Sequence, residues 1–304
     1  MGGVVVAIFE VPINEQYTLK GYNWPVDSPK AFIVAITGMD EYAERYDDFC
    51  KILNEHGYSV FFFDHFGQGR NAESAEKQEI WPKNAWDMTL KALHRKVTEC
   101  SVGGIPVYLF GHSMGSFVIQ AYLEHFPETA DKAVIMGSNG PARGTYAMGN
   151  FLSALTTNSH NWDKPSKFIN KMALGGYLKK IVSPKTPLDW LSYNEDNVKS
   201  YIADPYCGAH NTCGMYREFM RGLNELYRKP RLSRISERES ILIVSGIDDP
   251  VGNYGRGPIE LGKMYRKLGV RDVRVKIYPD MRHEILHESG NDHVISDILE
   301  FLDE

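Results

Sequence analysis

The stretch Val107–Phe126, VYLFGHSMGSFVIQAYLEHF, decides the fold. Its first part is an apolar run typical of a buried strand, and residues 114–126 have the spacing of a helix. Between the two lies G-H-S-M-G, which places Ser113 on a sharp strand-to-helix turn. Glycines two residues to either side admit a tight backbone there, and such a turn exposes the serine hydroxyl at the edge of a sheet. We interpret Ser113 as a nucleophile; the alternative is a phosphate-binding or merely structural turn.

Short apolar runs alternate with helical spacing along most of the chain. Runs rich in Val, Ile and Phe are typical of strands that helices cover on both faces. The alternation predicts an α/β fold with a mostly parallel, eight-stranded, doubly wound sheet flanked by helices. The strand candidates are residues 4–11, 17–24, 30–38, 58–67, 105–113, 131–138, 239–246 and 273–279. The helix candidates are residues 41–56, 85–100, 114–126, 257–269 and 292–304.

The alternation breaks between Pro141 and Arg238. This stretch has no convincing strand, but residues 146–157 and 165–178 are apolar, aromatic and helix-like. We predict a helical cap inserted over the carboxyl edge of the sheet, where open α/β sheets bind ligands. The predicted division is a core of residues 1–140 and 239–304 with a cap of residues 141–238.

Composition excludes several classes of protein. The 304 residues carry a formal net charge of -5, which does not suit a nucleic-acid surface. The cysteines form no C-x-x-C pair, which suits a reducing cytosol. Residues 1–15 hold an apolar run without a basic region, which we interpret as a strand and not a signal peptide. We therefore expect a cytoplasmic protein whose contact with a membrane, if any, is peripheral and through the cap.

A serine nucleophile needs a histidine to take its proton and a carboxylate to orient that histidine. Asp248 and Asp249 follow the strand candidate at 239–246, and His283 follows the one at 273–279. We favour Asp249 over Asp248, because Pro250 holds the residue before it extended and so gives the carboxylate a rigid mount. The reversed assignment stays open.

An oxyanion formed on acyl attack needs preorganised donors, usually backbone N–H groups. Met114 follows the nucleophile at the start of a helix, and Met39 lies in the loop after the third strand candidate. We predict that the amides of Met39 and Met114 form this oxyanion hole.

These motifs together resemble the monoacylglycerol lipase and lysophospholipase group of α/β-hydrolases, also classed with serine aminopeptidases. The carriers are TGMDEYAERYDDF, DHFGQG, GHSMG, SGIDDPVG and YPDMRHEILHE, which cover nearly the whole chain. Thr37, Tyr42, Phe66 and Gln68 depart from the residues usual in that group. The departures leave Ser113, Asp249 and His283 in place but bear on the choice of substrate.

The resemblance implies the α/β-hydrolase fold and a serine esterase acting on monoacyl lipids, such as lysophospholipids or monoacylglycerols, and on short-chain esters. It implies no cofactor. We expect the substrate to contact Gly38, His112, Phe151 and Leu155. The sequence gives neither the acyl chain length nor the oligomeric state, and a catalytically silent binding protein is disfavoured because every triad member is present.

Two alternatives name other enzymes. HEILHESGNDH, residues 283–293, matches the H-E-x-x-H-x-x-G-x-x-H pattern of metzincin zinc proteases. That pattern needs a long helix, but Pro279 and a strand candidate come just before it, so we expect no metal site. A peptidase that releases N-terminal residues needs an acidic anchor for the substrate amine, for which Asp204 or Glu195 are the candidates.

Overall fold

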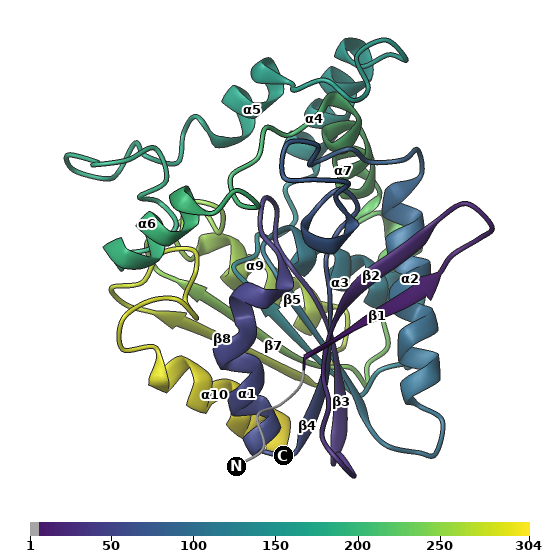
Figure 1. The fold of residues 1–304 in the computed structure, drawn as a ribbon. Helices are drawn as coiled ribbons and strands as arrows, with labels where there is room; N and C mark the ends of the chain where they lie inside the picture. The colour runs from purple at the N-terminus through teal and green to yellow at the C-terminus, as the bar shows by residue number, and fades with distance from the viewer. Residues whose placement is uncertain (1–5) are drawn as a thin grey trace.

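An eight-stranded sheet forms the centre of the structure (Figure 1). The computed structural model describes residues 6–304. The strand order is β1-β2-β4-β3-β5-β6-β7-β8; β1 and β2 pair antiparallel, and the strands from β4 to β8 in this order are parallel. The bounds are β1 Ala7–Pro12, β2 Thr18–Trp24, β3 Ala31–Ile36, β4 Tyr58–Phe63, β5 Val107–His112, β6 Lys132–Met136, β7 Ser240–Gly246 and β8 Asp272–Tyr278. The predicted fold class is confirmed, although residues 4 and 5 of the first strand candidate lie outside the described residues.

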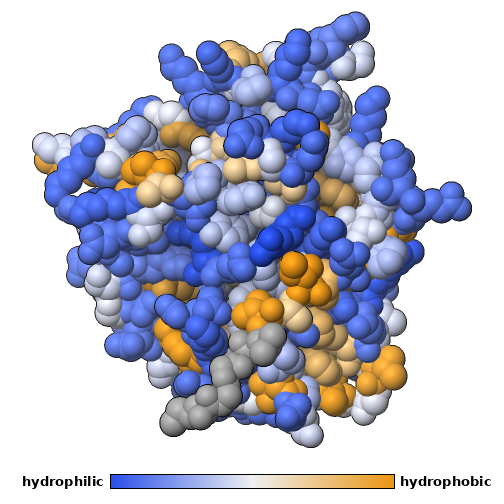
Figure 2. All heavy atoms as spheres, in the orientation of Figure 1, coloured by the Kyte–Doolittle hydropathy of each residue, from blue (hydrophilic) through white to orange (hydrophobic). Residues whose placement is uncertain are grey.

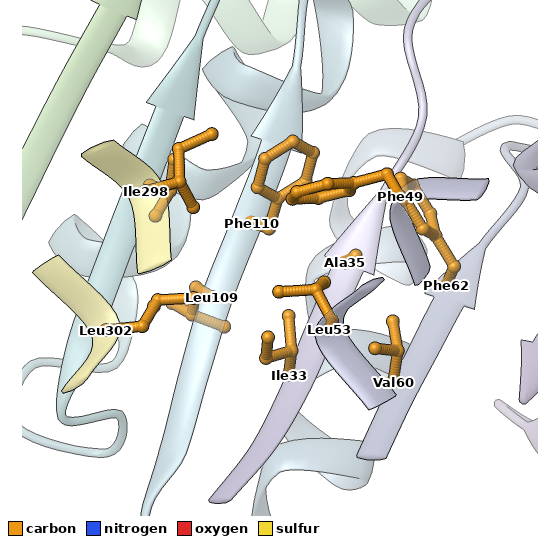
Figure 3. A pocket seen from close by; sticks show the side chains of 11 residues that line it. Ile33, Ala35, Phe49, Leu53, Val60, Phe62, Leu109, Phe110, Ile298 and Leu302 are labelled. Atoms are coloured by element: carbon orange, nitrogen blue, oxygen red, sulfur yellow. The ribbon is translucent and has the colours of Figure 1, made fainter. Parts of the chain in front are cut away.

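Helices cover both faces of the sheet (Figure 1). The bounds are α1 Asp47–Glu55, α2 Ala85–Cys100, α3 Met114–His125, α9 Arg256–Lys267 and α10 Asp292–Asp303. Side chains alternate along each strand, so Ile33 of β3 packs with α1 and α10, whereas Val34 packs in the cluster that includes α2, α3 and α9. Figure 3 shows the first of these layers, where Phe49, Leu53 and Ile298 surround an apolar void of about 10 Å³.

The helix predicted at 41–56 is divided into a short 3-10 helix and a shorter α-helix. Its first part is the 3-10 helix η1, Ala43–Tyr46, and α1 begins only at Asp47. The tighter turn buries the side chains of Arg45 and Tyr46 beside the carboxyl edge of the sheet. A second 3-10 helix, η2, covers Gly69–Asn71 in the loop after β4.

Five helices follow β6 before the chain returns to the sheet at β7. They are α4 Arg143–Thr156, α5 Lys167–Leu174, α6 Glu195–Ala203, α7 Cys213–Glu225 and α8 Lys229–Leu232. We call residues 141–238, which contain them, the cap; they lie over the carboxyl ends of the parallel strands (Figure 1). α7 joins the main hydrophobic core, because Phe219 packs against Trp86 of α2. Within residues 6–304, no helix combines the length and the apolar character needed to cross a bilayer.

Two glycines let α3 pack directly on the sheet. A Cβ atom on Gly115 would lie 2.4 Å from the carbonyl oxygens of both Ile36 and Thr37, at the end of β3. A Cβ atom on Gly111 would lie 2.5 Å from the carbonyl oxygen of Gly115. Real Cβ atoms do not approach backbone so closely, so both positions of the G-x-S-x-G motif require glycine.

Gly115→Ala should therefore destabilise the fold by about 1–3 kcal/mol, the usual cost of overpacking a close contact. Urea unfolding followed by circular dichroism measures this change. Gly144→Ala is the matched control in helix α4: no atom lies within 4 Å of its added Cβ, so it should stabilise by about 0.5–1 kcal/mol. Equal stabilities of the two variants would contradict the close packing.

Candidate active site

Ser113 has a strained backbone at the turn between β5 and α3. Its φ is 49° and its ψ is -117°, a combination that side-chain-bearing residues rarely adopt and that costs about 1–3 kcal/mol. Backbone bonds hold it there: its N–H donates to the carbonyl of Met136 at 3.0 Å, and its own carbonyl accepts from the Ser116 N–H at 2.9 Å. The strain is thus maintained by both flanking elements, as at a nucleophile elbow.

His283 and Asp249 meet beyond the ends of β8 and β7. The Nδ1 atom of His283 lies 3.0 Å from Oδ1 of Asp249, and both side chains are buried. Asp249 is also fixed by the Val251 N–H, which donates to Oδ1 at 2.8 Å. Asp248 points elsewhere and accepts from the Tyr193 hydroxyl at 2.9 Å. Of the two aspartates, the structure places Asp249 beside the histidine.

The Asp249 carboxylate also sets the proton affinity of His283. Burial alone lowers the pKa of a histidine, because it penalises the charged ring. The adjacent Asp249 outweighs this effect, so the pKa of His283 is raised above its ordinary value. A neutral His283 with a raised pKa is a stronger base for taking a proton from a neighbouring hydroxyl.

A cavity of about 990 Å³ lies between the sheet edge and the cap. Ser113, His283, Met39 and Met114 line it from the core side. The cap contributes mainly apolar side chains, from α4, α5 and α7 and from the segments between them. The cap side includes Tyr146, Met148, Ile169, Met172, Leu174, Leu188, Trp190, Phe219, Met220 and Leu223.

The two predicted oxyanion donors come from adjoining backbone segments. Gly115 packs on Ile36 and Thr37, so the loop after β3 lies against the first turn of α3. The Gly38 N–H donates to Oε1 of Glu41 at 2.5 Å, which fixes that loop just before Met39. Among residues 6–304, no protein group accepts a hydrogen bond from the amide of Met39 or Met114. Both amides remain available to a ligand, and both residues line the cavity.

The predicted substrate contacts are distributed unevenly. His112 lines the cavity, whereas Gly38 is not part of its lining. Phe151 and Leu155 lie on the outer face of α4 and are 57% and 68% exposed, so the structure does not place them against a ligand in the cavity. α4 instead contributes Tyr146, Met148 and its two glycines, because the apolar residues of this helix are divided between two faces.

A buried charged network, which sequence reasoning missed, lies beside the nucleophile. Arg45 donates to Glu41 at 2.8 Å and to both carboxylate oxygens of Glu284 at 2.7 and 2.9 Å. Nδ1 of His112 lies 2.7 Å from Glu41 and 2.7 Å from the Tyr46 hydroxyl. The side chains of Glu41, Tyr46, His112 and Glu284 are almost fully buried, and that of Arg45 is only slightly exposed. The E-x-x-x-R-Y pattern at 41–46 does not by itself predict this network, because Glu284 lies 239 positions from Arg45.

The network connects three separate parts of the chain. Burial would raise the pKa of both glutamates. The charges of His112 and Arg45 instead lower the pKa of Glu41, and the charge of Arg45 lowers that of Glu284. Both carboxylates are therefore ionised and paired. The amide of Asn197 in α6 also donates to Glu284 at 2.7 Å, so the cap is tied to the residue that follows His283.

The histidines of the zinc-protease pattern do not converge. Residues 283–291 form turns and not a helix, and α10 begins only at Asp292. His283 pairs with Asp249, His287 packs on the ring of Tyr46, and His293 is exposed at the start of α10. Residues 6–304 contain no group of three or more His, Cys, Asp or Glu side chains that could hold a metal ion.

The two candidate amine anchors lie outside the cavity lining. Asp204 accepts from the Tyr42 hydroxyl at 2.7 Å, and Glu195 is exposed and paired with Lys185. Of the other departures, Thr37 contacts the ring of His65 through its carbonyl oxygen at 2.9 Å. Gln68 is buried, and its side-chain amide has no hydrogen-bond partner within residues 6–304.

Comparisons with known proteins agree on the family. A family model described as serine aminopeptidase, S33, matches residues 27–290. The monoglyceride lipase of Saccharomyces cerevisiae is 23% identical over 275 residues, which cover 86% of this chain and 81% of that protein. A monoglyceride lipase homolog of Monkeypox virus is 30% identical over 106 residues, and the match spans only 37% of that protein and 35% of this chain.

A solved structure shares the fold over nearly the full length. A thermostable carboxyl esterase from Bacillus coagulans, crystallised in complex with glycerol, superposes with a TM-score of 0.88. The two chains are 23% identical, and the match covers 98% of this chain and 97% of the esterase.

The Arg45 network gives a stability prediction. Arg45→Met leaves two buried carboxylates without their cation and should destabilise by about 3–5 kcal/mol. Arg271→Met is the matched control, because Arg271 forms an exposed pair with Glu237 at 3.3 Å and should cost less than about 1 kcal/mol. Chemical denaturation of both variants measures the difference, and a cost at Arg45 no larger than at Arg271 would refute the buried pairing.

Proposed function

The chain belongs to the serine aminopeptidase S33 family of α/β-hydrolases, and on this premise we propose that it is a serine hydrolase cleaving carboxylic esters of monoacyl lipids. The cavity carries the proposal: it has the volume of a lipid-sized site, and apolar cap side chains face Ser113 and His283 across it. Monoacylglycerols and lysophospholipids are the substrate class, and short-chain esters are also cleaved. The names of the lipase and esterase relatives support an ester substrate.

In the proposed reaction, His283 takes the proton of the Ser113 hydroxyl as its oxygen attacks the ester carbonyl carbon. The Met39 and Met114 amides donate to the oxyanion, and Asp249 stabilises the imidazolium form of His283. The C–O bond to the leaving alcohol then breaks, and His283 gives its proton to that alcohol. Water, deprotonated by His283, releases the fatty acid and restores Ser113.

Peptide cleavage is the second candidate, since the matching family model is described as serine aminopeptidase. It requires a free acidic group near the serine to bind the substrate amine. The carboxylates that line the cavity are already engaged: Glu41 and Glu284 pair with Arg45, and Asp40 accepts from Asn211. The apolar cavity lining, and the absence of an unengaged carboxylate within it, favour an ester over a peptide as the substrate.

The cap surface also supports peripheral contact with a membrane. Residues 141–190 contain seven Lys or Arg and two Asp, a local net charge of +5 in a chain of net charge -5. Phe151, Leu155 and Phe168 are more than half exposed on α4 and α5, beside the cavity residues Met148 and Met172. Figure 2 shows apolar surface near α6 among hydrophilic residues. Apolar side chains interspersed with lysines suit an anionic lipid surface, from which a lipid would enter the cavity.

A substrate panel tests the activity. The enzyme should hydrolyse monoacylglycerols faster than aminoacyl anilides. Its kcat/KM should rise with acyl chain length until the cavity is filled, because each buried methylene contributes up to about 0.8 kcal/mol of binding free energy. Ser113→Ala should lower kcat by at least about a thousandfold, whereas Ser159→Ala, in a cap loop outside the cavity lining, should not. Preference for the anilide, or full ester hydrolysis by Ser113→Ala, would contradict the proposal.

Vesicle binding tests the membrane contact. The double variant Phe151→Glu and Leu155→Glu should bind anionic vesicles at least about tenfold more weakly, because it removes apolar area and adds charge repulsion. Hydrolysis of a soluble short-chain ester should be retained, since neither side chain lines the cavity. Ile259→Glu, at an exposed apolar position on α9, is the control and should leave binding intact. Equal loss in both variants would exclude the cap as the docking surface.

A further inference from the structure

Two buried carboxyl groups, Asp40 and Glu79, face each other beneath the loop that holds Met39. Asp40 directly follows Met39 and is 8% exposed, and Glu79, from the loop after β4, is fully buried. Neither carboxyl lies within ion-pair distance of a Lys, Arg or His side chain among residues 6–304. Three other almost fully buried acidic side chains near the active site, Glu41, Glu284 and Asp249, do have such a partner.

The surroundings of the pair contain no positive charge. The Glu79 carboxyl lies near Asp40, Gln68 and Trp81, and neither of its oxygens accepts a hydrogen bond within residues 6–304. Oδ2 of Asp40 accepts from the Asn211 amide at 2.9 Å. The titratable groups nearest the pair are Glu41, Tyr201, Tyr216 and His65, which stacks on Trp81. Burial lowers the pKa of His65 to about 4, so its ring is neutral.

Two ionised carboxylates in such a place would repel each other strongly, so a buried carboxyl pair keeps at least one proton. Burial raises the pKa of Asp40 to about 7 and that of Glu79 well above its ordinary value. Asp40 accepts a hydrogen bond from Asn211, which favours its ionised form, whereas neither Glu79 oxygen accepts one within residues 6–304; Glu79 is therefore the carboxyl favoured to keep the proton. A neutral Glu79 can donate a hydrogen bond to an ionised Asp40.

Asp40 joins the oxyanion loop to the cap. Its backbone is left-handed, with φ at 61°, so the loop is strained at this residue. Its carbonyl accepts from the Tyr201 hydroxyl at 2.7 Å and from the Gly208 N–H at 3.1 Å, both in the cap. A displacement of Asp40 would also move the amide of Met39, the residue directly before it, and would loosen both contacts with the cap.

We propose that Glu79 is a positioning residue that works in its protonated form, donating to the Asp40 carboxylate and so holding the Met39 amide in place for the oxyanion. The kinetic consequence of this role rests on the proposed function, whereas the shared proton does not depend on it. A ligand in the cavity is a poor alternative source of positive charge, because Oδ1 of Asp40 has no exposed surface. A cation held between the carboxyls is the remaining alternative, and the test below separates it.

Stability against pH tests the shared proton without any substrate. A carboxyl whose folded pKa is raised favours the folded state most below its unfolded pKa, and that stabilisation is lost as pH rises through the folded pKa. Glu79→Gln keeps an N–H donor for Asp40 and cannot ionise. Its melting temperature should exceed that of the wild type by a gap that is small near pH 5 and grows by several degrees toward about pH 9.

Kinetics tests the positioning role. Glu79→Gln should retain kcat for a soluble ester within about threefold, whereas Glu79→Met, which has a similar volume but no donor, should lower kcat at least about tenfold with little change in KM. Glu239→Gln is the matched control: Glu239 is another buried carboxyl with a pKa raised to about 7, at the far end of β7 from Asp249. It should gain stability at high pH and leave kcat unchanged.

Two results would overturn the proposal. A Glu79→Gln variant that is less stable than the wild type at every pH, with a wild-type melting temperature that falls after dialysis against a chelator, would show a bound cation and not a shared proton. A Glu79→Gln variant as slow as Glu79→Met would show that the negative charge is required. If the wild type hydrolyses no ester, the melting experiment still decides the proton sharing, and only the proposed function fails.

Discussion

The contact between α3 and the end of β3, around the strained backbone of Ser113, is the constraint on which the site depends. Gly115 leaves no room for a side chain between α3 and the carbonyls of Ile36 and Thr37. This contact brings the loop that carries Met39 against the helix start that carries Met114. It also fixes Ser113 at the carboxyl edge of the sheet, where β7 and β8 deliver Asp249 and His283. The strained turn at Ser113 and the placement of the two predicted oxyanion donors therefore depend on this close packing.

Around this contact the protein buries acidic groups and compensates their charge in different ways. Arg45 pairs with Glu41 and Glu284, and Asp249 pairs with His283. Asp40 and Glu79 have no cation and, in our proposal, share a proton. The pairing with Arg45 keeps Glu41 and Glu284 ionised, whereas the proton shared by Asp40 and Glu79 keeps one carboxyl neutral. Through Asn197 and Tyr201 the same groups anchor α6, so the cap and the proposed oxyanion loop are held by one set of polar contacts.

Much of the fold could be predicted from the sequence, because strand and helix periods are local signals. The turn at Ser113 and the order Ser113, Asp249, His283 were visible for the same reason. The Arg45 network was not, since it joins residues 239 positions apart and depends on rotamers. The expected substrate contacts of Phe151 and Leu155 do not lie in the cavity lining, because the apolar character of a residue does not say which face of α4 it occupies. The zinc-protease pattern at 283–293 shows the reverse case, in which the spacing matches but residues 283–291 are not helical.

The most direct measurement is covalent labelling with an alkyl fluorophosphonate followed by peptide mass spectrometry. The expected result is one alkylphosphonyl group per chain, attached to the peptide that contains Ser113, with loss of ester hydrolysis in proportion to labelling. His283→Ala and Asp249→Asn should slow this labelling by at least about a hundredfold, because the serine then lacks its oriented base. Labelling at another residue, or ester hydrolysis that survives complete modification of Ser113, would contradict the assignment of the active site.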